Sequence, residues 1–162
     1  MTIADRSKLF SIIAAFRLKI ERCWSEESAY KMPEIVTYGA YVSAGQCAVT
    51  CLVLMDQLHQ EFPGLSVALV SGQLQSTEGK IMILDHGWLQ VGLGTDRVII
   101  DPTVDQAASI QDAFTIGSEA EMIKKGLSYI PREIENDHGE VKHPNRFKRY
   151  QILKKAWEHL SY

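Results

Sequence analysis

The chain has 162 residues, of which 46% are hydrophobic and 23% are charged, a composition that suits a single folded domain with a sizeable core. Its formal net charge of -3 argues against a nucleic-acid-binding protein, since such proteins gather positive charge. The first segment is too charged for a signal peptide, and no run is apolar enough to span a bilayer. We therefore expect a cytoplasmic protein without membrane partners, and the odd count of 3 cysteines argues against a secreted disulfide framework.

Hydrophobic periodicity predicts two helices in the first part of the chain. Apolar residues recur at three- and four-residue steps from about residue 5 to 23, which indicates an amphipathic helix. Residues 24–42 have no such period and are expected to form a long loop of a kind that often carries function. The next helix, about residues 45–61, is apolar almost all round at first, which is typical of a helix buried at the centre of a domain.

The apolar period then changes to two, which predicts an antiparallel meander of strands. The expected strands are residues 65–74, 81–91 and 96–101, separated by turns at 76–79 and 92–95. A short helix at about 118–125, a polar loop at 135–144 and a last helix at about 145–160 complete the chain. The expected fold is α+β, with a buried central helix on a small antiparallel sheet and terminal helices beside it.

The predicted hairpin brings a histidine close to an aspartate. If residues 92–95 form a four-residue loop, Val91 pairs with Asp96, and His86 then lies opposite Asp101. Directly opposed residues have Cβ atoms about 5 Å apart, so the imidazole and the carboxylate are expected to form a hydrogen bond. Asp85 is a weaker alternative acid, because it points to the other face of a regular strand.

Cys47 is the candidate nucleophile that these two residues would serve. A thiol near a helix N-terminus is favoured as thiolate, an imidazole can hold it as an ion pair, and a carboxylate can orient that imidazole. Taken alone, Cys47 would be read as a small buried core residue, since free cysteine is often buried. Together with His86 and Asp101, it fits the logic of nucleophile, base and orienting acid.

A metal site built on Cys47 and Cys51 is the competing interpretation. These residues are four apart on one helical face, but structural zinc needs four ligands and no second pair with matching spacing follows. Cys51 is therefore expected to pack in the core, and no metal or organic cofactor is expected.

Three short motifs contain these residues: Gly45-Gln46-Cys47, His86-Gly87-Trp88, and Asp101-Pro102-Thr103 with Gln106. They resemble motifs of transglutaminase-like enzymes, a branch of the papain-like cysteine hydrolases. The resemblance covers about residues 43–106 and implies a papain-like catalytic core with a Cys-His-Asp triad. With Trp24-Ser25, the chain also resembles the small bacterial YunG-like group. It departs from transglutaminases proper in two ways. Ala48 follows the cysteine where they have an aromatic residue, and the chain is too short for their β-sandwich domains and calcium sites. Protein crosslinking is therefore not implied.

An oxyanion hole would require two hydrogen-bond donors near Cys47. The backbone N–H of Cys47 is one, because it lies in the first helical turn. For the second, the resemblance implies the Trp24 indole, while the Gln46 amide is an alternative and Trp88 is a further candidate for substrate binding. Trp24 could equally anchor the loop on the core, and Gln46 could cap the helix, since Ser43 and Gln46 have capping-box spacing.

The expected function is thiol-dependent hydrolysis or acyl transfer through a thioester intermediate, acting on a peptide, a protein or a small amide. Two alternatives stay open. One is a non-catalytic binding or immunity module on the same fold, and the other is an acetyltransferase that uses a thioester donor. The sequence does not indicate the oligomeric state.

Overall fold

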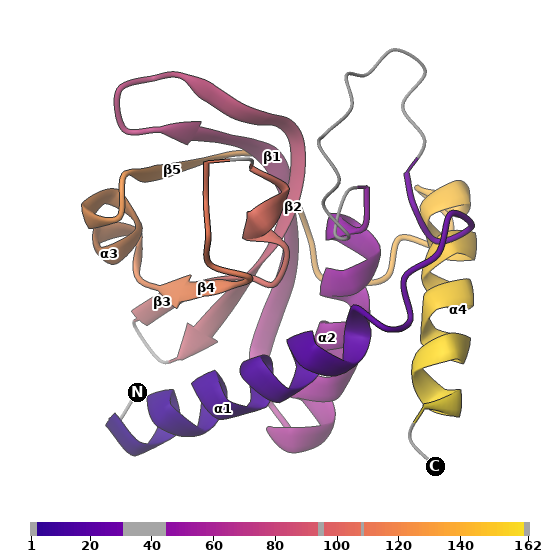
Figure 1. The fold of residues 1–162 in the computed structure, drawn as a ribbon. Helices are drawn as coiled ribbons and strands as arrows, with labels where there is room; N and C mark the ends of the chain where they lie inside the picture. Colours follow the sequence, from indigo (N-terminus) through magenta and orange to yellow (C-terminus); the bar gives the residue numbers. More distant parts are fainter. Residues whose placement is uncertain (1–2, 31–44, 94–95, 108, 161–162) are drawn as a thin grey trace.

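The computed structural model describes residues 3–30, 45–93, 96–107 and 109–160 (Figure 1). In chain order the elements are α1 (Ile3–Ile20), α2 (Cys47–Glu61), β1 (Ser66–Ser76), β2 (Ile81–Leu93), β3 (Asp96–Asp101), the 3-10 turn η1 (Val104–Gln106), β4 (Thr115–Gly117), α3 (Glu119–Lys124), β5 (Leu127–Glu135) and α4 (Pro144–His159). The fold is α+β, as the sequence predicts. Most of the expected loop at 24–42 lies outside the described residues.

The strands form one antiparallel sheet in the order β4-β3-β2-β1-β5. The long hairpin of β1 and β2 occupies the centre, and the two strands that the sequence did not predict, β4 and β5, lie at its edges (Figure 1). Helices α1, α2 and α4 lie on one side of this sheet, while α3 lies at the far side (Figure 1). Among the described residues, no helix combines the length and the apolar character needed to cross a bilayer.

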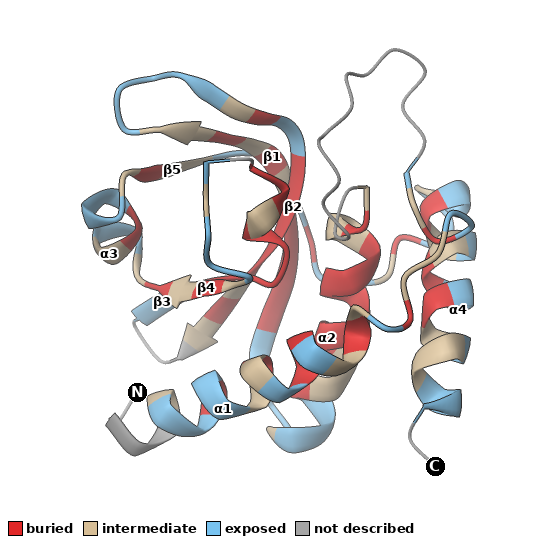
Figure 2. Ribbon diagram, in the orientation of Figure 1, coloured by how far each residue is buried: buried red, intermediate tan, exposed pale blue. Residues whose placement is uncertain are grey.

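Helix α2 is the buried centre of the fold, packed between the sheet and α4 (Figures 1 and 2). Eight of its residues are buried: Val49, Thr50, Cys51, Leu52, Val53, Leu54, Met55 and Leu58. Full burial of one large aliphatic side chain contributes about 1.5–3 kcal/mol, so the two faces of α2 together fix it firmly on the sheet. The N-terminal end of α2, where Cys47 lies, is therefore held in a defined position.

Alternation along β2 divides its side chains between the two faces of the sheet. Leu89 and Val91 belong to the core beside α1 and α2. Trp88 belongs to a second apolar cluster on the opposite face, which η1, α3 and β5 help to form: Val70, Leu74, Ile83, Trp88, Ile99, Val104, Ala107, Met122 and Leu127. This second face is the one that carries His86 and Asp101, because each lies two residues from a member of that cluster.

The predicted register of the β2–β3 hairpin is wrong by two residues. In the structure Leu93 pairs with Asp96 and Val91 pairs with Val98, because β2 continues to Leu93 and leaves a shorter connection than the expected four residues. Continued along the strands, this register sets Asp101 beside Trp88 instead of His86. Since a shift of two keeps every side chain on its face, His86 and Asp101 remain diagonal neighbours within reach of each other.

Candidate active site

His86 and Asp101 form a buried pair in which Nε2 of the imidazole lies 2.6 Å from Oδ2 of the carboxylate. The side chains of both residues are fully buried. The carboxylate has two further donors: the Tyr129 hydroxyl donates to Oδ2 at 2.8 Å and the Thr103 backbone N–H donates to Oδ1 at 3.0 Å. Asp101 is thus held from three directions, which fixes the position of the His86 ring.

Cys47 is the first residue of α2, and it remains a free, partly exposed thiol. Burial raises its pKa. The interaction with His86 and the backbone N–H groups of Gly87 and Ala48 lower it by more than burial raises it, so the net pKa is below that of an ordinary cysteine. The environment of Cys47 therefore favours the thiolate, the form that acts as a nucleophile.

His86 shows the complementary change. Burial lowers its pKa, but the charge and hydrogen bond of Asp101 and the interaction with Cys47 raise it, and the net pKa is above the ordinary value. Since Nε2 is occupied by Asp101, the remaining nitrogen, Nδ1, is the one available to Cys47. Nδ1 is buried and forms no hydrogen bond of ordinary geometry to a described residue, so it stays available to the thiol.

Gly87 explains how α2 comes so close to β2 at this point. A Cβ atom on Gly87 would lie 3.2 Å from Cα and 3.3 Å from N of Ala48, closer than side-chain carbons normally approach backbone. Cys51, one turn further along α2, is fully buried and its thiol donates to the Gly87 carbonyl at 3.6 Å. Burial raises the pKa of Cys51 well above its usual range, so this residue stays a packed thiol at the same contact.

Gln46 precedes the first residue of α2, and its amide is not free. Its side chain forms no cap hydrogen bond to the helix, and the capping-box alternative depends on Ser43, which lies outside the described residues. Instead, Nε2 of Gln46 donates to the Ser25 carbonyl and Oε1 accepts from the Ser28 hydroxyl, each at 2.9 Å. The buried Gln46 side chain thereby fastens the segment around residues 25–28 to the start of α2.

Trp24 is also held by contacts that support its alternative role as an anchor. Its indole N–H donates to the Thr50 hydroxyl at 2.9 Å, and the Arg17 guanidinium lies over its ring at 4.6 Å. Arg17 in turn donates to the carbonyl of Pro102 at 2.9 Å and pairs with Asp105 at 2.8 Å. These contacts connect α1 and α2 to the chain that follows Asp101, and the sequence did not indicate the role of Arg17.

Trp88 and the partly buried Tyr129 pack around the imidazole. Trp88 is fully buried, and its ring centroid lies 5.0 Å from that of Tyr129 and 6.2 Å from that of His86. Gln106, the last residue of the motif around Asp101, is also buried. Asp85, the alternative acid, pairs at the surface with Arg132 and is not a partner of His86.

One described cluster has metal-ligand spacing, and it includes none of Cys47, His86 and Asp101. It consists of Glu133, Glu135 and His143. Its carboxylates are already neutralised, because Glu133 pairs with Lys142 and Glu135 pairs with Arg146. A cation would have to compete with these positive side chains, so the cluster is an ion-pair network rather than a candidate metal centre.

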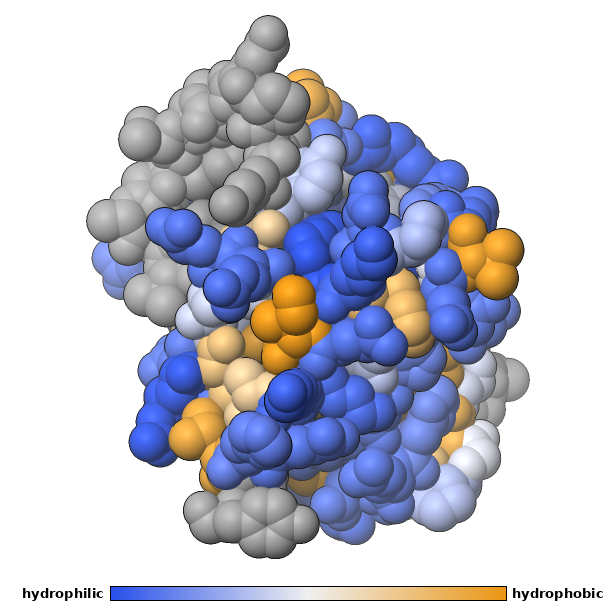
Figure 3. All heavy atoms as spheres, turned by 90° about the vertical axis from the view of Figure 1, so that its right-hand side faces the viewer, coloured by the Kyte–Doolittle hydropathy of each residue, from blue (hydrophilic) through white to orange (hydrophobic). Residues whose placement is uncertain are grey.

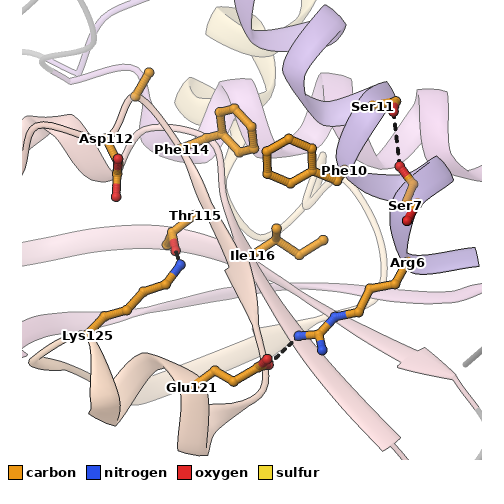
Figure 4. Close-up of a pocket in the computed structure, with 11 residues that line it drawn as sticks. Arg6, Ser7, Phe10, Ser11, Asp112, Phe114, Thr115, Ile116, Glu121 and Lys125 are labelled. Carbon is orange, nitrogen blue, oxygen red and sulfur yellow. Dashed lines mark hydrogen bonds and ion pairs between the residues drawn. The ribbon is translucent and has the colours of Figure 1, made fainter. Parts of the chain in front are cut away.

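A pocket of about 740 Å³ lies on another part of the molecule (Figure 4). It is formed by the first turns of α1, the residues that lead into β4, and α3, with the rings of Phe10 and Phe114 at its side (Figure 4). Arg6 pairs with Glu121 across it. No residue of the Cys47, His86 and Asp101 group lines this pocket, so we do not assign the candidate chemistry to it.

No protein-family model, curated protein or solved structure matches this chain. The functional interpretation therefore depends on the chemistry of the residues gathered around His86.

Proposed function

We propose that the chain is a thiol-dependent hydrolase or acyl-transfer enzyme with Cys47 as nucleophile, His86 as acid and base, and Asp101 as the group that orients His86. The observation that supports this most strongly is the buried imidazole between a carboxylate and a thiol. The pKa of that thiol is lowered although burial alone would raise it. A core cysteine without a function would show the opposite change, as Cys51 does.

In the first step the Cys47 thiolate attacks the carbonyl carbon of an amide or related acyl group. The bond to the leaving group breaks as the protonated His86 gives its Nδ1 proton to that group, which leaves an acyl thioester on Cys47. In the second step His86 takes a proton from water or from an amine as this second nucleophile attacks the thioester. The acyl product then departs, and the thiolate and the imidazolium are regenerated.

The backbone around Cys47 supplies part of the stabilisation of the developing charge. The N–H group of Cys47 lies at the open end of α2, where no helical carbonyl accepts it, and serves as one oxyanion donor. Asp101 contributes through His86, because it keeps the ring in the tautomer and orientation that present Nδ1 to the sulfur. No step requires a metal or an organic cofactor.

On this proposal the protein belongs with the transglutaminase-like enzymes of papain-like fold. A nucleophile at a helix start, followed by a histidine and an aspartate on neighbouring antiparallel strands, supports that placement. The substrate would be a peptide, a protein or a small amide. We also propose a cytoplasmic location, where the free thiols of Cys23, Cys47 and Cys51 would stay reduced.

The direct test is the rate of Cys47 alkylation by iodoacetamide across pH, in the wild type and in His86→Ala. We expect the wild type to react quickly at neutral pH and the variant to need a pH near that of an ordinary thiol, because the imidazolium is lost. Cys47→Ser serves as the control for labelling at the other two cysteines. A wild-type profile that matches an ordinary thiol would refute the proposal and leave a binding module as the better interpretation.

A further inference from the structure

Arg149 of α4 lies at the end of α2 that carries Cys47. Its guanidinium carbon is 5.2 Å from the centre of the Tyr30 ring. The Tyr30 backbone N–H donates to the Gly45 carbonyl at 2.8 Å. Gly45 has φ +72°, and a Cβ on it would lie 2.7 Å from the backbone carbonyl oxygen of Tyr30. Only glycine therefore permits this close approach. Tyr30 thus links Arg149 to the residue two positions before Cys47.

Arg149 contrasts with another arginine of the same helix. Arg146, one turn earlier in α4, binds both oxygens of Glu135 at 2.7 and 2.9 Å. Among the described residues, no carboxylate forms an ion pair with Arg149. Burial lowers the pKa of its guanidinium, and negative charge on Cys47 raises it. The half-buried guanidinium is therefore close enough to Cys47 for their charges to interact.

We propose that Arg149 is a specificity-determining residue that selects substrates with a carboxylate close to the acyl bond that Cys47 attacks. The inference rests on the proposed function and names the substrate class for the same site. A guanidinium binds a carboxylate through two parallel hydrogen bonds, and Arg149 would also offset the repulsion between that carboxylate and the thiolate. Acylated amino acids and peptides cleaved next to a free C-terminus have the required chemistry.

The surface over α4 agrees with a polar ligand. It is largely hydrophilic, with apolar side chains scattered across it (Figure 3). Lys148, next to Arg149 in the chain, is exposed, and no ion pair or hydrogen bond to a described residue is found for it. Because it carries the same charge on the same helix without the contact to Tyr30, Lys148 provides the matched control for Arg149.

The test compares two alkylating reagents that differ in charge. Iodoacetate and iodoacetamide both react with the Cys47 thiolate by forming a sulfur–carbon bond and releasing iodide, but only iodoacetate carries a carboxylate. The measured quantity is the ratio of their rate constants at Cys47, with the labelled site identified by mass spectrometry. We expect the wild-type ratio at low salt to exceed that of glutathione, and Arg149→Gln to lower it about fivefold or more. Lys148→Gln should leave it within about twofold.

The ratio separates this inference from the proposed function. Rapid labelling by both reagents, with a ratio equal to that of glutathione, would overturn the role of Arg149 and leave the nucleophile in place. Slow labelling by both would overturn the proposed function. If Arg149→Gln does not fold, Arg149→Lys takes its place, because an ammonium keeps the charge but cannot form two parallel hydrogen bonds to a carboxylate, and the ratio should still fall. An Arg149→Lys ratio equal to that of the wild type would refute the inference.

Discussion

Replacing Asp101 with asparagine should convert Cys47 into an ordinary thiol. Asparagine retains an oxygen for the Thr103 N–H, but its amide nitrogen can accept no hydrogen bond from Nε2 of His86. The imidazole would also lose the charge that raises its pKa, so burial would then dominate and leave His86 neutral near pH 7. Without the imidazolium, the Cys47 thiolate would lose its main stabilising partner.

The size of the effect follows from the thiolate fraction. An ordinary cysteine with a pKa of about 8.5 is roughly 3% thiolate at pH 7, whereas the proposal expects Cys47, as one member of an ion pair, to be mostly thiolate. Asp101→Asn should therefore slow alkylation of Cys47 by iodoacetamide about 30-fold at pH 7. The difference should shrink as the pH rises above 9, where an ordinary thiol also ionises.

The assay needs one control for charge and one for folding. Asp85→Asn removes an exposed carboxylate next to His86 in the chain, and it should leave the rate nearly unchanged because Asp85 pairs with Arg132 at the surface. Cys51 is fully buried, so its labelling should increase only if a variant unfolds. A folded Asp101→Asn protein that labels within about threefold of the wild type would refute the role given to Asp101.

Three further changes test contacts around the site and in the core. Tyr129→Phe removes a donor to Asp101 and should lower the free energy of unfolding by about 1–2 kcal/mol, measured in urea. Gly87→Ala should push the first turn of α2 away from β2 and slow Cys47 alkylation several-fold at pH 7. Asp56 accepts hydrogen bonds from a histidine, a tyrosine and a lysine, which hold its pKa well below the usual range. Asp56→Asn should cost about 2 kcal/mol at pH 7. This loss should fade progressively below about pH 4, because Asp56 takes up a proton there in the unfolded chain, and in the folded protein only at lower pH.

Hydrophobic periodicity in the sequence predicted the central helix and strands, but it did not predict the strands at the edges of the sheet. Helix α2 and strand β3 lie within two residues of their expected bounds, because one is apolar all round and the other is bounded by clear turn residues. Strand β5 was missed because it is an edge strand with Pro131 in its middle and with Ile130 and Ile134 exposed at 40% and 54%. It has no alternation to detect, since it lies largely at the surface.

The proximity of His86 and Asp101 could be foreseen because an error of two residues in register does not change the face of a strand. Tyr129 could not be foreseen, because its strand was not recognised. The contacts of Gln46 and Trp24 depend on how residues 25–28 and the first helix return to α2, which is a matter of tertiary packing. No local pattern in the sequence contains that information.

The central claim is that Cys47 carries an acyl group during turnover, and trapping that group tests it most directly. Wild-type protein would be mixed with an activated acyl ester such as p-nitrophenyl acetate, with released nitrophenol followed optically and the acylated residue identified by mass spectrometry. We predict repeated turnover, a transient thioester on Cys47, and loss of turnover in His86→Ala. Turnover that persists in Cys47→Ser and His86→Ala, or a wild type that never forms a thioester at Cys47, would contradict the account.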